Sequence, residues 1–381
     1  MNKERQSNYE LMRILLMFMV VFWHVIVNIV FGCNVTGASE MLWRLLYFLF
    51  EIHIDTFILM TGYFQCKKEK IEISKILKIN NQAYFYKIAF LIIFLLFSIV
   101  PISKMEIFWT IQPITLYNQY WYISIYLMLH LLSPFLNILL NKLSKKEHLY
   151  FITVLFFISS IIPTITRELA FNNNKGFSLL NFILLYVIGA YLRKYPIEKS
   201  YLFSRLTTDS RRLIFISTYF ILAFINLLIY YFQIPLNATN NSLLKEFAAI
   251  INHMQIAYNN PLLILQAIFF FLYFGELKIH SKIINYISAR TLDIYLIHDN
   301  YLLRSTIYRP INLFLKNTVL DYKAFFAAFI VSVITFIACF IIGLVKELLF
   351  KVFSMLPIYK KIKKNMQNRI KSLKLSSITN K

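Results

Sequence analysis

The stretch NYELMRILLMFMVVFWHVIV, residues 8–27, is long and apolar enough to cross a lipid bilayer. It nevertheless carries Arg13 near its start and His24 deep inside the apolar run. Because ionisable groups are costly within a bilayer, both side chains are expected to face the protein interior or a wet cavity. The stretch therefore predicts a membrane protein whose functional site lies partly on this helix.

The composition of the whole chain agrees with a membrane protein. Its 381 residues are 59% hydrophobic, with a mean hydropathy of +0.60, and only 15% are charged, whereas soluble domains contain about 25% charged residues. Since lipid offers no partner to free backbone groups, the expected fold is an all-α polytopic transmembrane helical bundle. About ten spanning helices are predicted, at 11–31, 42–62, 82–102, 120–140, 149–165, 178–192, 213–233, 259–275, 289–306 and 324–345. No cleavable signal peptide is expected.

Basic residues are distributed unevenly between the segments that join these spans. If the N-terminus is cytoplasmic, alternate segments and the C-terminal tail hold 30 of the 40 basic residues, and the other loops hold 7. Cytoplasmic loops carry such an excess of Lys and Arg. The bias predicts that both termini are cytoplasmic. It also accounts for the net charge of +22 without a nucleic-acid partner.

The spacing of the spans predicts one integral-membrane domain, 1–350, followed by a basic cytoplasmic tail, 351–381. Attraction to anionic lipid headgroups is the simplest role for the tail. Segment 234–258 is expected to form an outer amphipathic helix or lid. Aromatic residues at span ends predict an interfacial belt: Trp43, Trp109, Tyr120, Trp121 and Tyr122. The scattered Cys33, Cys66 and Cys339 indicate neither a disulfide framework nor a metal site, so no metal is expected.

The first span holds a polar stripe. Eleven residues, or about three helical turns, separate Arg13 from His24, so both point to one face about 16 Å apart along the axis. Asn28 lies four residues after His24, on the same face. A structural histidine hydrogen-bonded between helices is the alternative interpretation of His24. The arginine in phase with it favours a functional role.

The second span holds the sequence EIHIDTFILMTGYF, residues 51–64. Asp55 lies near mid-span, so it is expected to have a partner, either His24 or a buried basic group. The neighbouring His53 is a candidate supporting residue. The small pair Thr61–Gly62 predicts a close approach to another helix.

The ninth span holds the densest group of polar residues within the membrane. These are Asp293, His298, Asp299, Asn300 and Arg304 in TLDIYLIHDNYLLR, residues 291–304. The fourth span contains His130 within the stretch YWYISIYLMLHLLSPFLN, residues 120–137, and Pro134 is expected to kink or end the span. His298 and Asp299 are candidate supporting residues, together with Asn28, His53 and Asp55.

Together these segments resemble acyltransferase family 3, a family of integral-membrane acyltransferases. The first helix has the family's Arg, ten residues, then His, as Arg13 and His24. The second ends in HIDTFILMTGYF, similar to the family pattern His-x-x-x-Phe followed by Ser/Thr-Gly-Tyr-Phe. Similar pieces follow in family order: ISKILKINNQAYFYKI, WYISIYLMLHLLSPFLN and IYLIHDN. The chain has Thr61 where Ser is commoner, and Lys78 near where many members carry Arg.

The resemblance is closest to the branch that O-acetylates bacterial surface polysaccharides. It implies that a multi-pass protein of the bacterial plasma membrane moves an acyl group, most often acetyl, from cytoplasmic acyl-CoA to a hydroxyl. The acceptor is then a cell-surface or lipid-linked polysaccharide. It also implies that His24 is catalytic, as a base or as a covalent acyl carrier. Arg13 and Lys78 suit the phosphates of acetyl-CoA.

Two other classes of protein fit the same composition. A polytopic transporter or flippase also uses intramembrane His, Asp and Arg, but the chain lacks internal repeats and paired Gly/Pro-broken helices. An envelope glycan polymerase is also apolar and basic. Such enzymes carry catalytic charges on large outer loops, whereas segment 234–258 holds one Lys and one Glu.

Overall fold

A computed structural model of the chain describes residues 5–31, 37–113, 120–170, 173–316 and 322–355. Within these ranges the protein is helical and contains no strand, which confirms the predicted all-α class. The elements of the first half are α1 (Ser7–Val25), η1 (Ile26–Val30), α2 (Gly37–Phe50), α3 (His53–Gln65), α4 (Ile73–Leu96), α5 (Lys104–Ile111), α6 (Trp121–Lys142), α7 (Lys145–Phe156), η2 (Phe157–Ile161) and α8 (Ile162–Thr166). Those of the second half are η3 (Asn174–Gly176), α9 (Leu179–Lys194), η4 (Ile197–Lys199), α10 (Thr208–Ala238), α11 (Ser242–Gln255), α12 (Pro261–Gly275), α13 (Lys282–Ser288), α14 (Thr291–His298), α15 (Tyr301–Lys316) and α16 (Tyr322–Met355).

Seven of the ten predicted spans are confirmed as helical segments long and apolar enough to cross a membrane, within the residues that the structure describes. They are Ser7–Asn28, Gly37–Gln65, Ile73–Leu96, Trp121–Lys142, Lys145–Thr166, Thr208–Ala238 and Phe325–Val352. The chain is therefore a multi-pass membrane protein. The other three predicted spans coincide with shorter helices: 178–192 with α9, 259–275 with α12, and 289–306 with α14 and α15.

Two of the shorter helices, α9 and α12, begin at identifiable caps. The Ser178 side chain caps α9 by accepting from Asn181 N, and α12 begins at Asn260–Pro261, where Asn260 caps it. Helices of 16 and 15 residues measure about 24 and 22 Å. Nearly every residue on the middle of α9 is buried. The protein rather than lipid thus surrounds α9, and its length need not match the bilayer.

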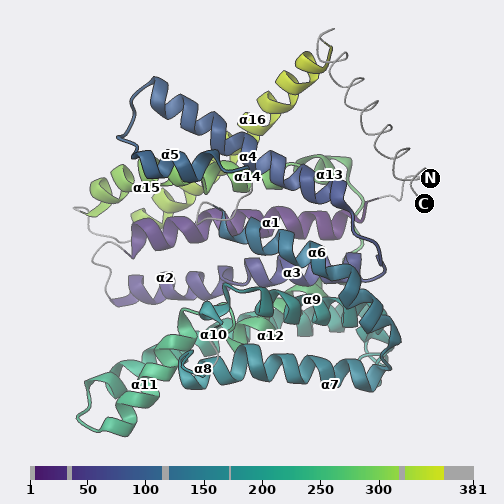
Figure 1. Ribbon diagram of the computed structural model, residues 1–381. Helices are drawn as coiled ribbons and strands as arrows, with labels where there is room; N and C mark the ends of the chain where they lie inside the picture. The colour runs from purple at the N-terminus through teal and green to yellow at the C-terminus, as the bar shows by residue number, and fades with distance from the viewer. Residues whose placement is uncertain (1–4, 32–36, 114–119, 171–172, 317–321, 356–381) are drawn as a thin grey trace, which may run out of the picture.

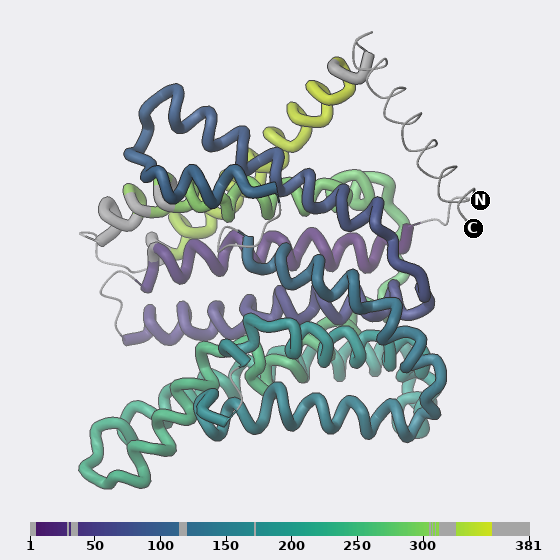
Figure 2. Tube along the Cα trace, in the orientation of Figure 1, coloured from purple at the N-terminus to yellow at the C-terminus, as the bar shows by residue number. Residues whose placement is uncertain are grey.

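The helices run nearly side by side, as Figures 1 and 2 show, so their ends gather at two opposite ends of the bundle. We call the end where α1 begins and α3, α6, α9 and α12 stop the basic end. Three hydrogen bonds join helix ends there: Asn8 to Phe274 O (2.9 Å), Asn137 to Gln65 O (2.9 Å) and Lys194 to Leu140 O (2.7 Å). The opposite end, where α1 stops and α3, α6, α9 and α12 begin, is the far end.

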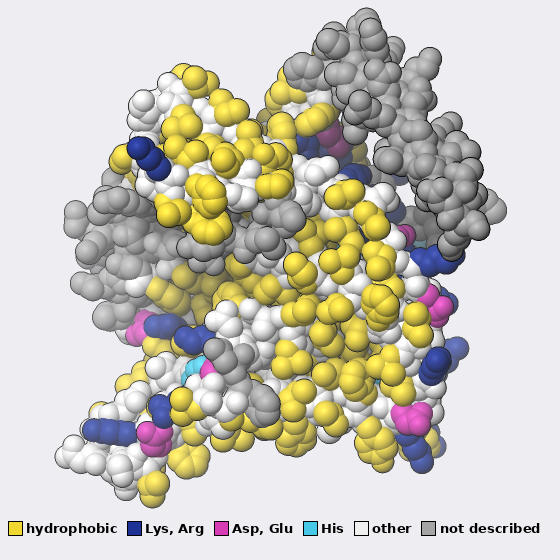
Figure 3. All heavy atoms as spheres, in the orientation of Figure 1, with side chains coloured by type: hydrophobic (Ala, Val, Ile, Leu, Met, Phe, Trp, Pro, Cys, Tyr) yellow, Lys and Arg dark blue, Asp and Glu magenta, His cyan; other side chains and the backbone are white. Residues whose placement is uncertain are grey.

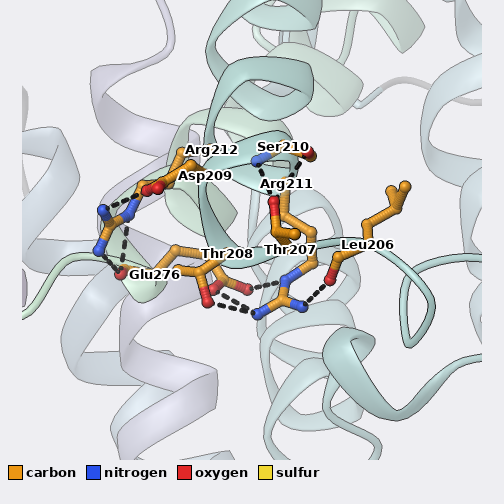
Figure 4. A network of polar contacts seen from close by, with 8 residues as sticks. All are labelled: Leu206, Thr207, Thr208, Asp209, Ser210, Arg211, Arg212 and Glu276. Carbon is orange, nitrogen blue, oxygen red and sulfur yellow. Dashed lines mark hydrogen bonds and ion pairs between the residues drawn. The ribbon is translucent and has the colours of Figure 1, made fainter.

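An ion-pair network fastens α10 to α12 at the basic end (Figure 4). Arg211 donates from Nε and Nη2 to the two carboxylate oxygens of Glu276, at 2.7 and 2.8 Å. Arg212 donates from Nε and Nη2 to the Glu276 carbonyl oxygen, at 3.1 and 2.7 Å. Such two-pronged contacts are stronger and more directional than single ones. They fix the start of α10 against the last turn of α12.

Helices α3 and α9 cross with their backbones in contact, as the pair Thr61–Gly62 predicted. A Cβ added at Gly62 would lie 2.1 Å from Tyr186 O, and one at Gly189 would lie 2.1 Å from Leu59 O. Neither position can therefore carry any side chain without separating the helices. This crossing forms a rigid wall on one side of the bundle interior.

The outer surface is apolar around the middle and charged towards the ends (Figure 3). Exposed side chains such as Phe97, Phe135 and Leu213 are the kind that face lipid acyl chains. The predicted aromatic belt is wrong for some of its members, because Trp43 and Tyr120 are buried in the protein core. Large rings at span ends pack between helices as readily as they lie at a membrane surface.

The segment 234–258 forms a helix over part of its length. Helix α11 (Ser242–Gln255) is amphipathic, with Leu243 and Phe247 exposed on its apolar side. The first residues of the segment, 234–238, belong instead to the end of α10, which continues through Pro235 to Ala238. Pro134 likewise lies inside α6 and does not end it. Residues 356–381 of the predicted basic tail lie outside the described residues.

Candidate active site

A cavity of about 1140 Å³ runs through the bundle beside α1. On this helix it is lined at the helical spacing of three or four residues, by Tyr9, Glu10, Arg13, Met17, Val20, Trp23, His24, Val27 and Asn28. Tyr9 and Asn28 are nineteen residues apart, which is about 28 Å along a helix and close to the thickness of a bilayer core. The cavity therefore extends from the basic end of the bundle to the far end.

Positive charge concentrates where the cavity meets the basic end. Five basic side chains line it there in addition to Arg13: Arg5, Lys67, Lys68, Lys75 and Arg193. Arg193 is held by the Tyr63 hydroxyl, at 3.1 Å from Nη1, and its guanidinium stacks 4.9 Å from the Tyr63 ring centroid. Lys68 pairs with Glu72 at 2.7 Å, and this ammonium lowers the pKa of the exposed Glu72 carboxyl. The cluster suits an anion with several negative charges.

Arg13 lies inside the cavity, two helical turns beyond its opening. Its Nη1 is 3.0 Å from Glu10 Oε2, and its side chain keeps about a third of its surface exposed. The prediction that Arg13 and His24 share one face is confirmed, since both line the cavity. Arg5 precedes Arg13 at the basic end, so Arg5 lies nearer the opening of the cavity.

Lys78 does not line the cavity. It is exposed on α4, and the cavity is lined from that helix by Lys75 and Ile79. Lys75 and Ile79 are about 40° apart around α4, whereas Lys78 is turned about 100° from Ile79, so it points away from the direction that the two lining residues share. The predicted contact of Lys78 with a donor therefore has no support in the geometry, and Lys75 is the lysine of α4 that lines the cavity.

His24 meets a second histidine from the other end of the sequence. Its Nδ1 is 3.0 Å from Nε2 of His298, and the two ring centroids are 5.2 Å apart. His298 Nδ1 is in turn 2.8 Å from the carbonyl oxygen of Ile294, one helical turn earlier in α14. His298 is buried, whereas His24 lines the cavity.

This chain of contacts fixes which nitrogen of each neutral ring carries the proton. A carbonyl oxygen only accepts, so Nδ1 of His298 must be the donor there, and Nε2 of a neutral His298 is then an acceptor. His24 therefore donates from Nδ1 to His298. Its Nε2 keeps a lone pair that can accept a proton from the cavity or attack an electrophile.

An acidic group stands beside the free nitrogen of His24. Asp299 Oδ1 is 3.9 Å from His24 Nε2 and 3.2 Å from Nη1 of Arg304. All three side chains line the cavity. If His24 takes up a proton at Nε2, a carboxylate at Asp299 is placed to stabilise the imidazolium, and Arg304 adds a positive charge beside Asp299.

The backbone changes form next to His24. Helix α1 ends at Val25 and continues as the π-helical turn η1, a feature that is frequent at functional sites. The Asn28 side chain lies in this turn and donates to the His24 carbonyl oxygen at 2.8 Å. Asn28 therefore supports the backbone at His24 rather than its ring.

His53 and Asp55 both lie in the first turn of α3 but have different surroundings. His53 lines the cavity, and its Nδ1 is 2.7 Å from the Phe50 carbonyl oxygen, so its Nε2 is also left as an acceptor. Trp23 separates the two histidines, with ring centroids 5.6 Å from each. The expectation that Asp55 pairs with His24 is wrong. Asp55 is fully buried, and neither carboxylate oxygen has a partner among the described residues.

The family is decided by a comparison with known proteins. A family model described as an acyltransferase domain matches residues 6–344, which includes every residue that lines the cavity except Arg5. The chain belongs to acyltransferase family 3. No curated protein and no solved structure matches the chain.

Membership of acyltransferase family 3 makes the protein a membrane acyltransferase, and it removes the transporter and polymerase alternatives. The cavity geometry fits that chemistry, because a proton acceptor lies within a passage that opens among basic side chains. The sequence showed the polar density around His298 but not its contact with His24. Arg193 was missed because a basic residue at a span end is what the distribution of charge already predicts.

Proposed function

We propose that this acyltransferase moves an acetyl group from cytoplasmic acetyl-CoA to a hydroxyl of a cell-surface or lipid-linked polysaccharide in the bacterial plasma membrane. One observation carries the proposal. A single cavity connects a cluster of basic side chains at one end of the bundle to the free nitrogen of His24 deep inside it. A donor with a phosphorylated head and a long arm fits that arrangement.

The basic end supplies the binding site for the phosphates of the donor. Lys67, Lys75 and Arg193 surround the opening, and Arg13 lies farther along the same passage. Arginine binds phosphate through paired, charge-assisted hydrogen bonds, and lysine adds point charge. The excess of basic residues at this end also supports its placement on the cytoplasmic side. The acyl arm then extends along α1 towards His24.

His24 acts as a general base in this mechanism. The acceptor hydroxyl gives its proton to Nε2 of His24 while its oxygen attacks the thioester carbonyl carbon. The carbon–sulfur bond breaks, and the proton held by His24 passes to the departing thiolate of CoA. His298 holds the ring in the required tautomer, and Asp299 stabilises the imidazolium between the two proton transfers.

The same nitrogen can instead attack the thioester and carry the acetyl group itself. The two routes differ in one measurable property. A covalent route exchanges labelled CoA into acetyl-CoA when no acceptor is present, whereas the general-base route does not.

The proposal is tested with sealed membrane vesicles of both orientations and acetyl-labelled acetyl-CoA, which does not cross membranes. Inverted vesicles are expected to transfer label to membrane glycan, and right-side-out vesicles are not. Vesicles from cells that lack the gene are the control. Equal labelling in both orientations would contradict a cytoplasmic donor site. No labelling above the control would contradict the donor or the acceptor.

A further inference from the structure

The far end of the cavity has a lining that donor binding does not explain. Three aromatic side chains from different parts of the chain meet there: Trp121, Phe177 and Tyr258. Trp121 is the first residue of α6, and Phe177 lies two residues before α9. Since Arg193 near the other end of α9 is at the basic end, these rings lie about 24 Å from it along that helix.

The three rings are in mutual contact. The ring centroids of Trp121 and Phe177 are 4.5 Å apart, those of Phe177 and Tyr258 are 4.8 Å apart, and those of Trp121 and Tyr258 are 6.2 Å apart. The interplanar angles of 56°, 72° and 32° place the rings at inclined angles rather than in one stack. We call Trp121, Phe177 and Tyr258 the aromatic cluster.

The backbone that carries the cluster is closely fitted. Tyr258 N donates to the Lys175 carbonyl oxygen at 2.9 Å, which joins the two loops that hold Phe177 and Tyr258. Gly176, the residue between Lys175 and Phe177, has a φ of +81°, and a Cβ on it would lie 2.5 Å from Asn259 N. Only glycine fits this contact, because its conformation and the space both exclude a side chain. The cluster is therefore positioned by a specific loop packing.

The cluster is linked to the reaction centre through Trp23 and His53. The Tyr258 ring centroid is 6.3 Å from that of Trp23 and 6.0 Å from that of His53. Trp23 is in turn 5.6 Å from His24. Asp299 and Arg304 add polar groups to the cavity wall beside His24.

We propose that the aromatic cluster is the acceptor subsite and binds the apolar face of a pyranose ring. This inference rests on the proposed function, since it assigns the place of the acceptor in that reaction. A pyranose presents C–H groups on its faces and hydroxyls around its edge, so it fits aromatic rings beside charged hydrogen-bonding groups. One hydroxyl of a ring held on the cluster points towards Nε2 of His24.

The test uses purified protein in lipid nanodiscs, acetyl-CoA, and p-nitrophenyl β-glucopyranoside as a defined probe, with acyclic sorbitol as the matched control. Trp121→Leu and Phe177→Leu are each expected to raise the KM for the glucoside about 3- to 10-fold, the range of a lost aromatic contact. The KM for acetyl-CoA and the transfer to sorbitol are expected to stay within twofold. Phe108→Leu, which changes an exposed ring outside the cavity, controls for loss of an aromatic residue.

A separate binding measurement keeps this inference distinct from the proposed function. Titration of the glucoside is expected to change tryptophan fluorescence in the wild type, and Trp121→Phe is expected to lose most of that change. This holds whether or not acetyl is transferred. An unchanged glucoside KM in both leucine variants would overturn the subsite, as would a glucoside that binds no better than sorbitol. So would an equal rise in the KM for acetyl-CoA, because it would indicate general damage to the cavity.

Discussion

The two ends of the cavity differ in chemistry although the same helices build both. The basic end is lined by lysine and arginine, with Arg193 at the end of α9 and Lys67 just after α3. The far end is lined by aromatic rings, with Phe177 before α9 and His53 at the start of α3. Lysine and arginine thus gather at the basic end, and Trp121, Phe177 and Tyr258 gather at the far end.

This difference means that the two ends of the cavity favour different molecules. A charged, phosphorylated molecule is favoured at one end, and a neutral molecule with apolar faces is favoured at the other. His24 lies towards the far end, in the last turn of α1, so a molecule that enters from the basic end must extend along α1 to meet one bound at the far end. The comparison predicts that substitutions separate into three groups, which affect the donor, the acceptor or the chemical step.

The largest effect is expected at His24, which the proposed mechanism uses as the general base. His24→Ala and His24→Gln are expected to reduce acetyl transfer by about 10²–10⁴-fold, the usual loss when a general base is removed. The KM for acetyl-CoA is expected to stay within threefold, because the basic end is untouched. Label transfer to membrane glycan measures the rate, and a blot checks the protein level. A His24→Gln protein that kept more than about a tenth of the activity would return His24 to a structural role.

A smaller effect is expected at His298, which contacts the ring of His24 and does not line the cavity. His298→Ala is expected to lower kcat about 10- to 100-fold, since His24 loses the acceptor that fixes its tautomer. His298→Gln is expected to recover much of this loss, because its amide oxygen can accept from Nδ1 of His24. The kcat and the KM for acetyl-CoA are measured for both variants.

The comparison of the two variants separates positioning from packing. If alanine and glutamine at position 298 reduce kcat equally, the hydrogen bond from His24 contributes nothing and the histidine only fills space. A rise in KM with constant kcat would place His298 in substrate binding instead.

The smallest effect is expected among the basic residues. It compares Lys75, which lines the cavity, with Lys78, which does not. Arg13→Ala and Lys75→Ala are each expected to raise the KM for acetyl-CoA about tenfold, because each removes a positive charge from the cavity wall. Lys78→Ala is the matched control. It is expected to change the KM for acetyl-CoA less than twofold, since Lys78 is exposed outside the cavity. Equal effects of Lys75→Ala and Lys78→Ala would contradict the donor path, as would an unchanged KM in Arg13→Ala.

Local patterns predicted much of this arrangement. Helical phase alone placed Arg13 and His24 on one face, because that relation depends only on residues within one helix. The small pair Thr61–Gly62 predicted a close helix crossing, although its partner Gly189 could not be identified. The total number of spans was less certain, since caps and breaks shorten α9, α12 and α14 within apolar runs.

Contacts between distant segments could not be predicted from the sequence. His24 and His298 are 274 residues apart, and neither residue's neighbours indicate the meeting. Arg193 and the aromatic cluster were hidden by general rules of membrane proteins, which already expect basic residues and aromatic rings at span ends. At Asp55 a general rule predicted too much. Buried charges usually have partners, but neither carboxylate oxygen of Asp55 has one among the described residues.

Helix α1 also sets the length that the arm of a donor must have. Arg13 and His24 lie on one unbroken α-helix, so the rise of the helix fixes their separation along the axis at about 16 Å. A donor anchored by its phosphates at the basic end must have an arm of matching length to present its carbonyl carbon at His24. Donors that share the same thioester but lack the anchor or the full arm should therefore lose turnover as well as affinity, because remote binding holds the reacting bond in place.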